Sequence, residues 1–390
     1  MSAPPLLEVR GLSVGFLTGT RGEVREAVDG VSLTVARGRR VGLVGESGSG
    51  KSLTSLAILG LLDAGTTRVS GQVLYQGEDL RAAGPERQRA LRGDRMALVF
   101  QDPLAAMNPV LRVGAQVVEA LTSRRRMRRG EARARAVELL KRVGMPDAEA
   151  RADAWPHELS GGMRQRACIA MALACDPDLL IADEPTTALD VTVQAQVLDL
   201  LGAVQAERGL GILLISHDLG LVAGWCDEVH VMYAGQLVES GAAERVLTRP
   251  RHPYTAALLE SLPTPGRRRE RLPELPGRVP EPGQQLGGCR FHPRCGVATE
   301  RCRTQAPVWS PLPDGGVRCH HPMALAAGPE GAVAAPQGAD DVSSNELPPP
   351  GGAASTGSGT GPHAGASDGT RASDGTRAFA PFAASEGEAS

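Results

Sequence analysis

The sequence predicts an α/β protein built on a largely parallel, buried sheet. Short apolar stretches, such as residues 178–182 and 211–215, alternate with longer segments of helical periodicity. Strands without a polar face, separated by helices, are typical of a parallel sheet that is covered on both sides. A glycine-rich turn joins another apolar stretch, residues 39–44, to a helical segment at 52–59. A strand, a glycine-rich turn and a helix N-terminus in this order predict a phosphate-binding loop.

Composition limits the class of protein. The 390 residues suffice for two domains or for one large domain with a tail, and 42% of them are hydrophobic. The formal net charge of −2 argues against a globally basic nucleic-acid-binding protein. No apolar run approaches the ~20 residues of a membrane span, and the first residues lack a signal-peptide pattern, so we expect a cytoplasmic protein. Seven cysteines in a reducing compartment argue against a disulfide framework.

The phosphate-binding loop is the stretch Gly45-Glu-Ser-Gly-Ser-Gly-Lys-Ser52, which fits the pattern G-x-x-x-x-G-K-S/T. Its glycines let successive backbone N–H groups point at one anion, and the dipole of the following helix adds partial positive charge. Lys51, one of only two lysines in the chain, would neutralise the β- and γ-phosphate oxygens, and the Ser52 hydroxyl would bind Mg²⁺. The residues predicted to bind the nucleotide are Gly45, Ser47, Gly48, Ser49, Gly50, Lys51 and Ser52.

A small antiparallel sheet is predicted to precede the loop. Three β segments, at residues 6–10, 12–16 and 27–35, come before it in the sequence. Phe16 belongs to this sheet and is either the face on which adenine stacks or an ordinary core aromatic.

Two further stretches differ in character from the α/β core. Helical periodicity from residue 110 to residue 158 predicts a helical insertion at about 102–165. The arginine run at 124–129 indicates a solvated face there, with a phosphate-binding patch as the alternative. Residues 323–390 are rich in Ala, Gly, Ser and Pro, which predicts a disordered tail, because such a composition buries too little apolar surface to offset chain entropy.

Two acidic residues follow an apolar strand, at the sheet edge where ligands collect in parallel sheets. Asp183 and Glu184 come directly after the stretch Leu179-Leu-Ile-Ala182. Successive residues leaving a strand point to opposite sides, so the two carboxylates can have different roles. We predict that Asp183 holds Mg²⁺, directly or through water, and that Glu184 orients and polarises the attacking water.

A second candidate anion site is Ser160-Gly161-Gly162, at the start of a helical segment. A serine with two glycines at a helix N-terminus can cap an anion, although in isolation it indicates only an ordinary N-cap. The order of motifs along the chain resembles the ATP-binding-cassette (ABC) ATPase family over about residues 6–245. The motifs are the phosphate loop, Gln101, Ser160-Gly161-Gly162, Asp183-Glu184, Asp190 and His217.

The resemblance implies that two cassettes enclose two ATP molecules head to tail and that hydrolysis separates them. Ser160, Gly161 and Gly162 would contact the γ-phosphate of the ATP held by the partner. Gln101 would sense Mg²⁺ and would pass this signal on to a membrane subunit. Asp190 would bridge the protomers, and His217 would hold the γ-phosphate and the water, whereas a lone His217 would indicate only a satisfied histidine at a strand end.

Longer stretches narrow the resemblance to the oligopeptide/dipeptide importer ATPases, as far as about residue 321. They are Gly45–Ser52, Phe100-Gln-Asp-Pro103 with Asn108-Pro109, Gly161–Arg166 and Arg251-His-Pro-Tyr254. This likeness implies an ATP-hydrolysing, energy-coupling subunit for the import of peptides or related small solutes.

The same likeness implies the partners of the chain. They would be a second ABC ATPase, identical or different, two transmembrane permease subunits and, indirectly, an extracytoplasmic solute-binding protein, without nucleic acid. The chain would lie peripherally on the cytoplasmic face of the cell membrane. The alternative is a soluble ABC ATPase that acts on DNA or ribosomes. The single cassette, the lack of a long coiled-coil insertion and the lack of global basic charge argue against it.

The region 246–322 contains four clustered cysteines, Cys289, Cys295, Cys302 and Cys319. Four thiolates in a short, core-poor segment suit a [4Fe-4S] cluster or Zn²⁺, with free thiols as a third alternative, and the lack of a C-x2-C pair weakens the zinc interpretation. The resemblance favours iron, because some peptide-importer ATPases carry an iron–sulfur cluster in this region. We expect a structural site in an appendage that is too small to fold on its own apolar core.

Overall fold

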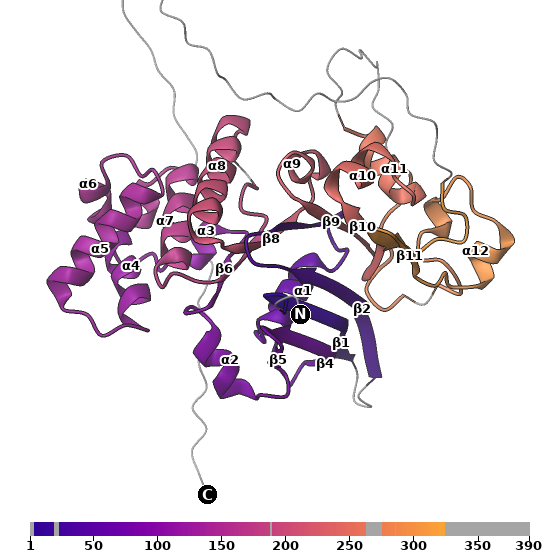
Figure 1. Ribbon diagram of the computed structural model, residues 1–390, viewed down its shortest axis with the longest axis horizontal. Coiled ribbons are helices and arrows are strands. Elements are labelled where there is room, and N and C mark those ends of the chain that lie inside the picture. Colours follow the sequence, from indigo (N-terminus) through magenta and orange to yellow (C-terminus); the bar gives the residue numbers. More distant parts are fainter. Residues whose placement is uncertain (1–3, 19–22, 188, 263–274, 285, 324–390) are drawn as a thin grey trace, which may run out of the picture. The chain divides into compact units, whose positions relative to one another are not determined.

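An eight-stranded mixed sheet forms the centre of the protein (Figure 1). The structure is a computed structural model, and it describes residues 4–18, 23–187, 189–262, 275–284 and 286–323. The strand order is β11-β12-β10-β9-β3-β8-β7-β6, and neighbours from β9 to β6 run parallel, as predicted. The strands are β3 (Arg40–Val44), β6 (Met96–Val99), β7 (Leu179–Asp183), β8 (Gly211–Ser216), β9 (Glu228–Tyr233), β10 (Gln236–Ala242), β11 (Ser310–Leu312) and β12 (Gly315–Val317).

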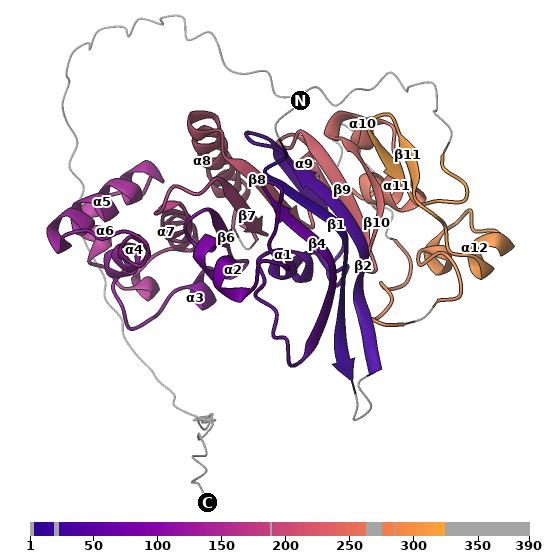
Figure 2. The same cartoon turned by 60° about the horizontal axis from the view of Figure 1, so that its bottom comes forward.

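The predicted antiparallel sheet is present and has four strands, in the order β2-β1-β4-β5. Figure 2 shows β2, β1 and β4 side by side. They are β1 (Leu7–Thr18), β2 (Glu23–Val35), β4 (Thr67–Tyr75) and β5 (Glu78–Asp79). The two short strands predicted at residues 6–10 and 12–16 are one strand, β1, which continues through a break in its register. Gly11 lies in this break at φ +58°, a backbone conformation that glycine adopts without strain.

Two apolar cores explain why the central strands carry no polar face. Leu180 and Leu214 belong to the core shared with the helices, and Leu179 and Leu213 belong to the core under the antiparallel sheet. All four side chains are buried. Because successive side chains of a strand point to opposite faces, each of these strands must be apolar on both sides.

Helices fill the predicted insertion, and Figure 1 shows them gathered beyond the β6 edge of the large sheet. In α5, buried Ala132, Ala136, Leu139 and Leu140 recur at three- and four-residue spacing and form the apolar stripe that the sequence predicted. The helices here are α3 (Pro103–Ala106), α4 (Val113–Thr122), α5 (Arg129–Arg142), α6 (Ala148–Ala152), the 3₁₀ turn Pro156–Glu158 and α7 (Gly161–Leu173).

The remaining helices lie before and after this insertion in the sequence. They are α1 (Lys51–Ile58), α2 (Pro85–Leu91), α8 (Val191–Arg208), α9 (Leu219–Ala223), α10 (Ala243–Thr248), α11 (Pro253–Glu260), the 3₁₀ turn His292–Arg294 and α12 (Glu300–Thr304). Among the described residues, no helix combines the length and apolarity that crossing a membrane requires.

Two short strands of the C-terminal region join the large sheet, so a separate appendage is not confirmed. Strand β12 pairs with β10 of the β9–β10 hairpin, and β11 adds a further strand. Glu239 on β10 stands opposite Val317 on β12. The predicted tail at 323–390 lies outside the described residues, apart from Met323.

Candidate nucleotide site

The phosphate loop lies between β3 and α1 and follows a path that requires glycine. Gly48 and Gly50 have φ values of +81° and +102°, and Gly50 is the N-cap of α1. A Cβ atom at Gly45 would collide with the backbone carbonyl oxygen of Met232. The loop is also tied to the β9–β10 turn, because the amide of Gly235 donates to the carbonyl oxygen of Ser49 at 2.9 Å. The backbone is therefore held close to its neighbours in a shape that larger residues would disrupt.

Lys51 is buried within the loop that it would serve. Its Nζ donates to the carbonyl oxygens of Gly45 at 2.7 Å and Glu46 at 3.1 Å, and it lies 4.0 Å from Oε1 of Glu184. Burial lowers the pKa of Lys51, although the nearby carboxylates oppose this shift. The ammonium group is thus placed among carbonyl oxygens at the point where a phosphate anion would meet the loop.

Ser52 and Asp183 form the oxygen pair predicted to hold Mg²⁺. The Ser52 hydroxyl donates to Oδ1 of Asp183 at 3.0 Å. Burial raises the pKa of Asp183, and the Ser52 hydrogen bond offsets part of this effect. A hydroxyl and a carboxylate suit Mg²⁺, which commonly completes its shell with water and phosphate oxygens.

Glu184 is the centre of the site. Its Oε2 lies 3.0 Å from Nε2 of Gln101, 2.9 Å from Oγ1 of Thr187 and 3.1 Å from Nδ1 of His217. The backbone at Glu184 has φ +47°, which is uncommon for a residue with a side chain and is typical of functional sites. The structure therefore brings together Gln101, Glu184 and His217, although residues 101 and 217 are 116 positions apart in the sequence.

Thr187 was not among the residues predicted from the sequence. A turn places it there, since the amide of Thr187 donates to the carbonyl oxygen of Glu184 at 3.2 Å. The signal in the sequence was the position of Thr187, three residues after Glu184 and beyond Pro185. A turn at this spacing allows the hydroxyl to donate to the carboxylate of the acidic residue.

Ser160 and Asp190 are helix N-caps on the surface. The side chain of Ser160 accepts from the amide of Met163 in α7 at 3.3 Å, and that of Asp190 accepts from the amide of Val193 in α8 at 2.9 Å. Both residues are exposed, as is Gly161. In the described part of the chain, no hydrogen bond connects either cap to the phosphate loop of the same chain. Their outer surfaces are thus open to a partner.

Two family models match this chain, one over the nucleotide site and one over the C-terminal region. Residues 28–187 match the family model described as ABC transporter, and residues 238–302 match the C-terminal region of oligopeptide/dipeptide transporters. The dipeptide transport ATP-binding protein DppD of Escherichia coli is 47% identical over 319 residues, covering 82% of this chain and 97% of that protein. The chain belongs to the ABC transporter ATPases.

Other relatives agree with this assignment. A protein of Brucella abortus named for ATP binding in peptide import is 50% identical over 310 residues, covering 80% of this chain and 93% of that protein. The bacterial ABC transporter cassette MJ0796, solved as a dimer, has a TM-score of 0.55 and 28% identity, covering 61% of this chain and 99% of its own. The structure of cbiO1 from Clostridium perfringens has a TM-score of 0.53 and 28% identity, covering 63% of this chain and 91% of that chain. ATP hydrolysis with Mg²⁺, coupled to transport, is the activity of this family.

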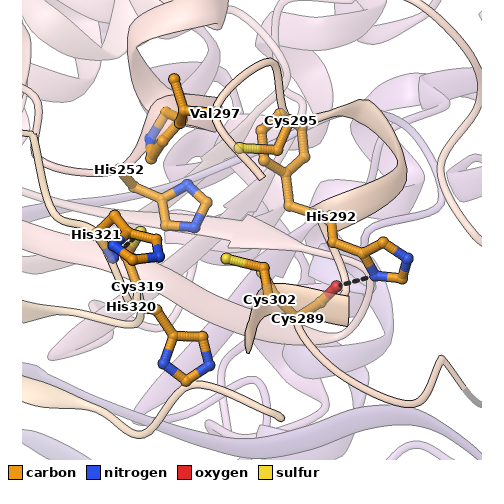
Figure 3. Close-up of a pocket in the computed structure, with 11 residues that line it drawn as sticks. His252, Cys289, His292, Cys295, Val297, Cys302, Cys319, His320 and His321 are labelled. Carbon is orange, nitrogen blue, oxygen red and sulfur yellow. Dashed lines mark hydrogen bonds between the residues drawn. The ribbon is translucent and has the colours of Figure 1, made fainter. Parts of the chain in front are cut away.

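The four cysteines of the C-terminal region line one pocket of this ABC ATPase. In Figure 3, the sulfur atoms of Cys295 and Cys302 point toward the same space, which the ring of His252 borders. Cys289 and Cys319 line the same pocket, and all four thiols are free. Burial raises the pKa of Cys289 and Cys295, and raises that of Cys319 to about 11.

The donor set of this pocket fits a thiolate-bound metal group in kind. Four cysteines from different segments face it, and Phe291 contributes an apolar wall. Within the described ranges, however, no three His, Cys, Asp or Glu side chains are grouped so as to hold a metal ion. The other cysteines, Cys168, Cys175 and Cys226, are buried and do not line this pocket.

Proposed function

We propose that this ABC ATPase is the energy-coupling subunit of an importer for peptides or related small solutes. The observation that carries the proposal is the convergence of Gln101, Thr187 and His217 on Glu184, next to Lys51 and the phosphate loop. The matched C-terminal region and the names of the relatives favour peptide import over the alternative of an ATPase acting on DNA or ribosomes.

In the proposed reaction, the phosphates of ATP lie in the loop at residues 45–52, which supplies N–H groups and the Lys51 ammonium. Adenine stacks on Phe16, which lies on β1 with 39% of its surface exposed and is therefore accessible to a ligand. Mg²⁺ is held through Ser52, Asp183 and Gln101. Glu184 accepts the proton of the attacking water, and His217 orients the water and the γ-phosphate.

The site is proposed to be completed by a second cassette. Ser160, Gly161 and Gly162 cap the γ-phosphate in the partner's loop, and Asp190 bridges the two protomers. The exposure of Ser160, Gly161 and Asp190 supports this arrangement, since their outer surfaces are not covered by the described part of their own chain. The partner is a second copy or a different ABC ATPase.

The pair of ATPases is proposed to lie peripherally on the cytoplasmic face of the membrane, against two permease subunits. An extracytoplasmic binding protein delivers the solute to those permeases. Closure of the cassettes on ATP moves the permeases, so that ATP binding in the cassettes changes the transport path through the permeases.

The transport function is tested with cells that lack this chain. Uptake of radiolabelled di- and tripeptides should be lost, and should be restored by the unmodified chain but not by Glu184→Gln. The matched assay measures ATP hydrolysis by the purified chain with and without duplex DNA. Unchanged uptake in the deficient cells, together with DNA-stimulated hydrolysis, would transfer the assignment to the alternative.

The cysteine pocket is proposed to hold a [4Fe-4S] cluster that stabilises the C-terminal region. The support is the donor set of Cys289, Cys295, Cys302 and Cys319 around one pocket. Held by these four cysteines, a cluster would cross-link the segments that carry them. Zn²⁺ and free thiols are the alternatives.

Metal analysis distinguishes these alternatives. Protein purified without oxygen should contain about four irons and four sulfides per chain, and Cys302→Ser should lower both. Cys168→Ser is the matched control, because Cys168 is a buried cysteine in α7, outside the pocket. About one zinc and no sulfide would indicate a zinc site, and metal-free protein with unchanged folding would indicate free thiols.

A further inference from the structure

The second residue of the phosphate loop, Glu46, is held by side chains from the C-terminal region. Its carboxylate accepts two hydrogen bonds from the guanidinium of Arg294, at 2.7 and 3.0 Å. Its backbone amide donates to the hydroxyl of Tyr254 at 3.0 Å. Its carbonyl oxygen accepts from Nζ of Lys51 at 3.1 Å. The same carbonyl oxygen accepts from the backbone amide of Ser49 at 3.2 Å. Every polar group of Glu46 thus has a partner, and two of the four partner residues come from beyond residue 250.

Arg294 is buried and fixed in place. Only 4% of its side chain is exposed, its Nε donates to the carbonyl oxygen of Pro276 at 2.8 Å, and its guanidinium lies 5.8 Å from the ring centre of Tyr233. A buried guanidinium without a carboxylate partner is strongly destabilising. Glu46 supplies that partner in a two-bond geometry, which fixes direction as well as distance. The loop and the C-terminal region therefore depend on each other at this contact.

Tyr254 belongs to an aromatic cluster that connects the same two regions. Its ring centre lies 4.7 Å from that of Tyr233 on β9 and 5.3 Å from that of Phe291. The side chain is fully buried, and burial raises the pKa of its hydroxyl, which stays protonated. Phe291 and Cys295 line the cysteine pocket, and Cys295 is the residue after Arg294. A continuous set of contacts thus runs from the pocket to the phosphate loop.

We propose that Arg294 and Tyr254 are positioning residues for the phosphate loop, and that through them the C-terminal region sets the affinity for a nucleoside triphosphate. The loop binds anions through backbone N–H groups, whose directions depend on the loop conformation. Fixing Glu46 at its amide and its carboxylate orders the loop before the ligand arrives, which reduces the entropy lost on binding. The inference rests on the proposed nucleotide site, and it adds two residues that do not touch the nucleotide.

The test compares Arg294→Met with Arg290→Met in the full-length chain. Arg290 lies in the same segment, forms an ion pair with Asp29 at 2.6 Å and donates to the carbonyl oxygen of Ala234 in the β9–β10 turn, but it has no hydrogen bond or ion pair with the phosphate loop itself. Arg294→Met should raise the KM and Kd for Mg-ATP about tenfold and leave kcat within about twofold, because ground-state binding is what changes. Arg294→Lys should restore part of the affinity, since it keeps the charge and loses the two-bond geometry. Arg290→Met should leave both constants unchanged.

Two further variants test the same contact and control for unfolding. Tyr254→Phe keeps the aromatic packing and removes the hydroxyl, so thermal melting should change little while the Kd for Mg-ATP rises about threefold. Glu46→Gln should weaken binding, and combining it with Arg294→Met should add little, because both changes break one contact.

The outcomes separate this inference from the proposed nucleotide site. Equal loss of affinity in Arg294→Met and Arg290→Met would show a merely structural role, and lower kcat at unchanged KM would also overturn the inference. Lys51→Ala is measured in parallel. If it loses ATP binding while Arg294→Met and Tyr254→Phe bind normally, only the positioning role fails. If Lys51→Ala binds ATP normally, the nucleotide site itself is wrong, and the inference fails with it.

Discussion

Replacing Glu184 with glutamine should abolish hydrolysis and leave ATP binding intact. Glutamine has the shape of glutamate, and its carbonyl oxygen can accept the hydrogen bonds that Gln101 and Thr187 now direct at Oε2, at 3.0 and 2.9 Å. What disappears is the negative charge that accepts a proton from water. Removing a general base slows such reactions by about 10²–10⁴, which corresponds to about 3–5 kcal/mol in the activation free energy.

The assay measures kcat for phosphate release and, separately, the Kd for Mg-ATP. Glu184→Gln should keep the Kd within about threefold, because Lys51, 4.0 Å away, keeps its bonds to the loop carbonyls. Thr187→Val is the matched variant, since it removes one of the contacts to Oε2 and keeps the carboxylate. It should lower kcat about tenfold, the effect expected from misorienting the base. Turnover by Glu184→Gln within about threefold of the unmodified rate would remove Glu184 from the mechanism.

Three other changes give separate tests. Lys51→Ala should abolish detectable ATP binding, measured by calorimetry, because no other lysine lies in the loop to neutralise the phosphates. Glu184→Gln saturated with Mg-ATP should elute as a dimer in gel filtration with its partner ATPase, and a double variant with Ser160→Arg should remain monomeric; persistent monomer in the single variant would contradict the shared site. Ending the chain after Met323 should leave hydrolysis and melting temperature unchanged, whereas ending it before Ser310 removes β11 and β12 and should lower the melting temperature.

The parts of the site that the sequence predicted are those made by neighbouring residues. The phosphate loop is eight consecutive residues, and Asp183-Glu184 follows an apolar strand directly, so local patterns suffice to place them. The two short β segments predicted before the loop are one strand because Gly11 tolerates a positive φ, which a pattern of apolar residues does not reveal.

The parts that escaped prediction depend on tertiary contacts. Arg294 is 248 residues from Glu46, and nothing in its local sequence, His292-Pro-Arg294, distinguishes it from other arginines of the chain. Strand β12 is Gly315-Gly-Val317, too short and too rich in glycine to show a period of two. Its place in the sheet is decided by pairing with β10, which a local pattern of residues does not reveal.

The contacts of Lys51 explain why the loop must be held from outside. Burial disfavours the Lys51 ammonium, as its lowered pKa indicates, and carbonyl oxygens of the loop compensate it before any phosphate arrives. Two carbonyl oxygens of the loop thus already lie against the ammonium, and an incoming phosphate must compete with them for it. In the proposed positioning role, Arg294 and Tyr254 fix Glu46, whose carbonyl oxygen Lys51 contacts, so that the loop keeps one conformation. An incoming phosphate then takes the place of the carbonyl dipoles beside Lys51 and brings a full negative charge. Because the ammonium is already in place, the loop need not rearrange to accept the phosphate.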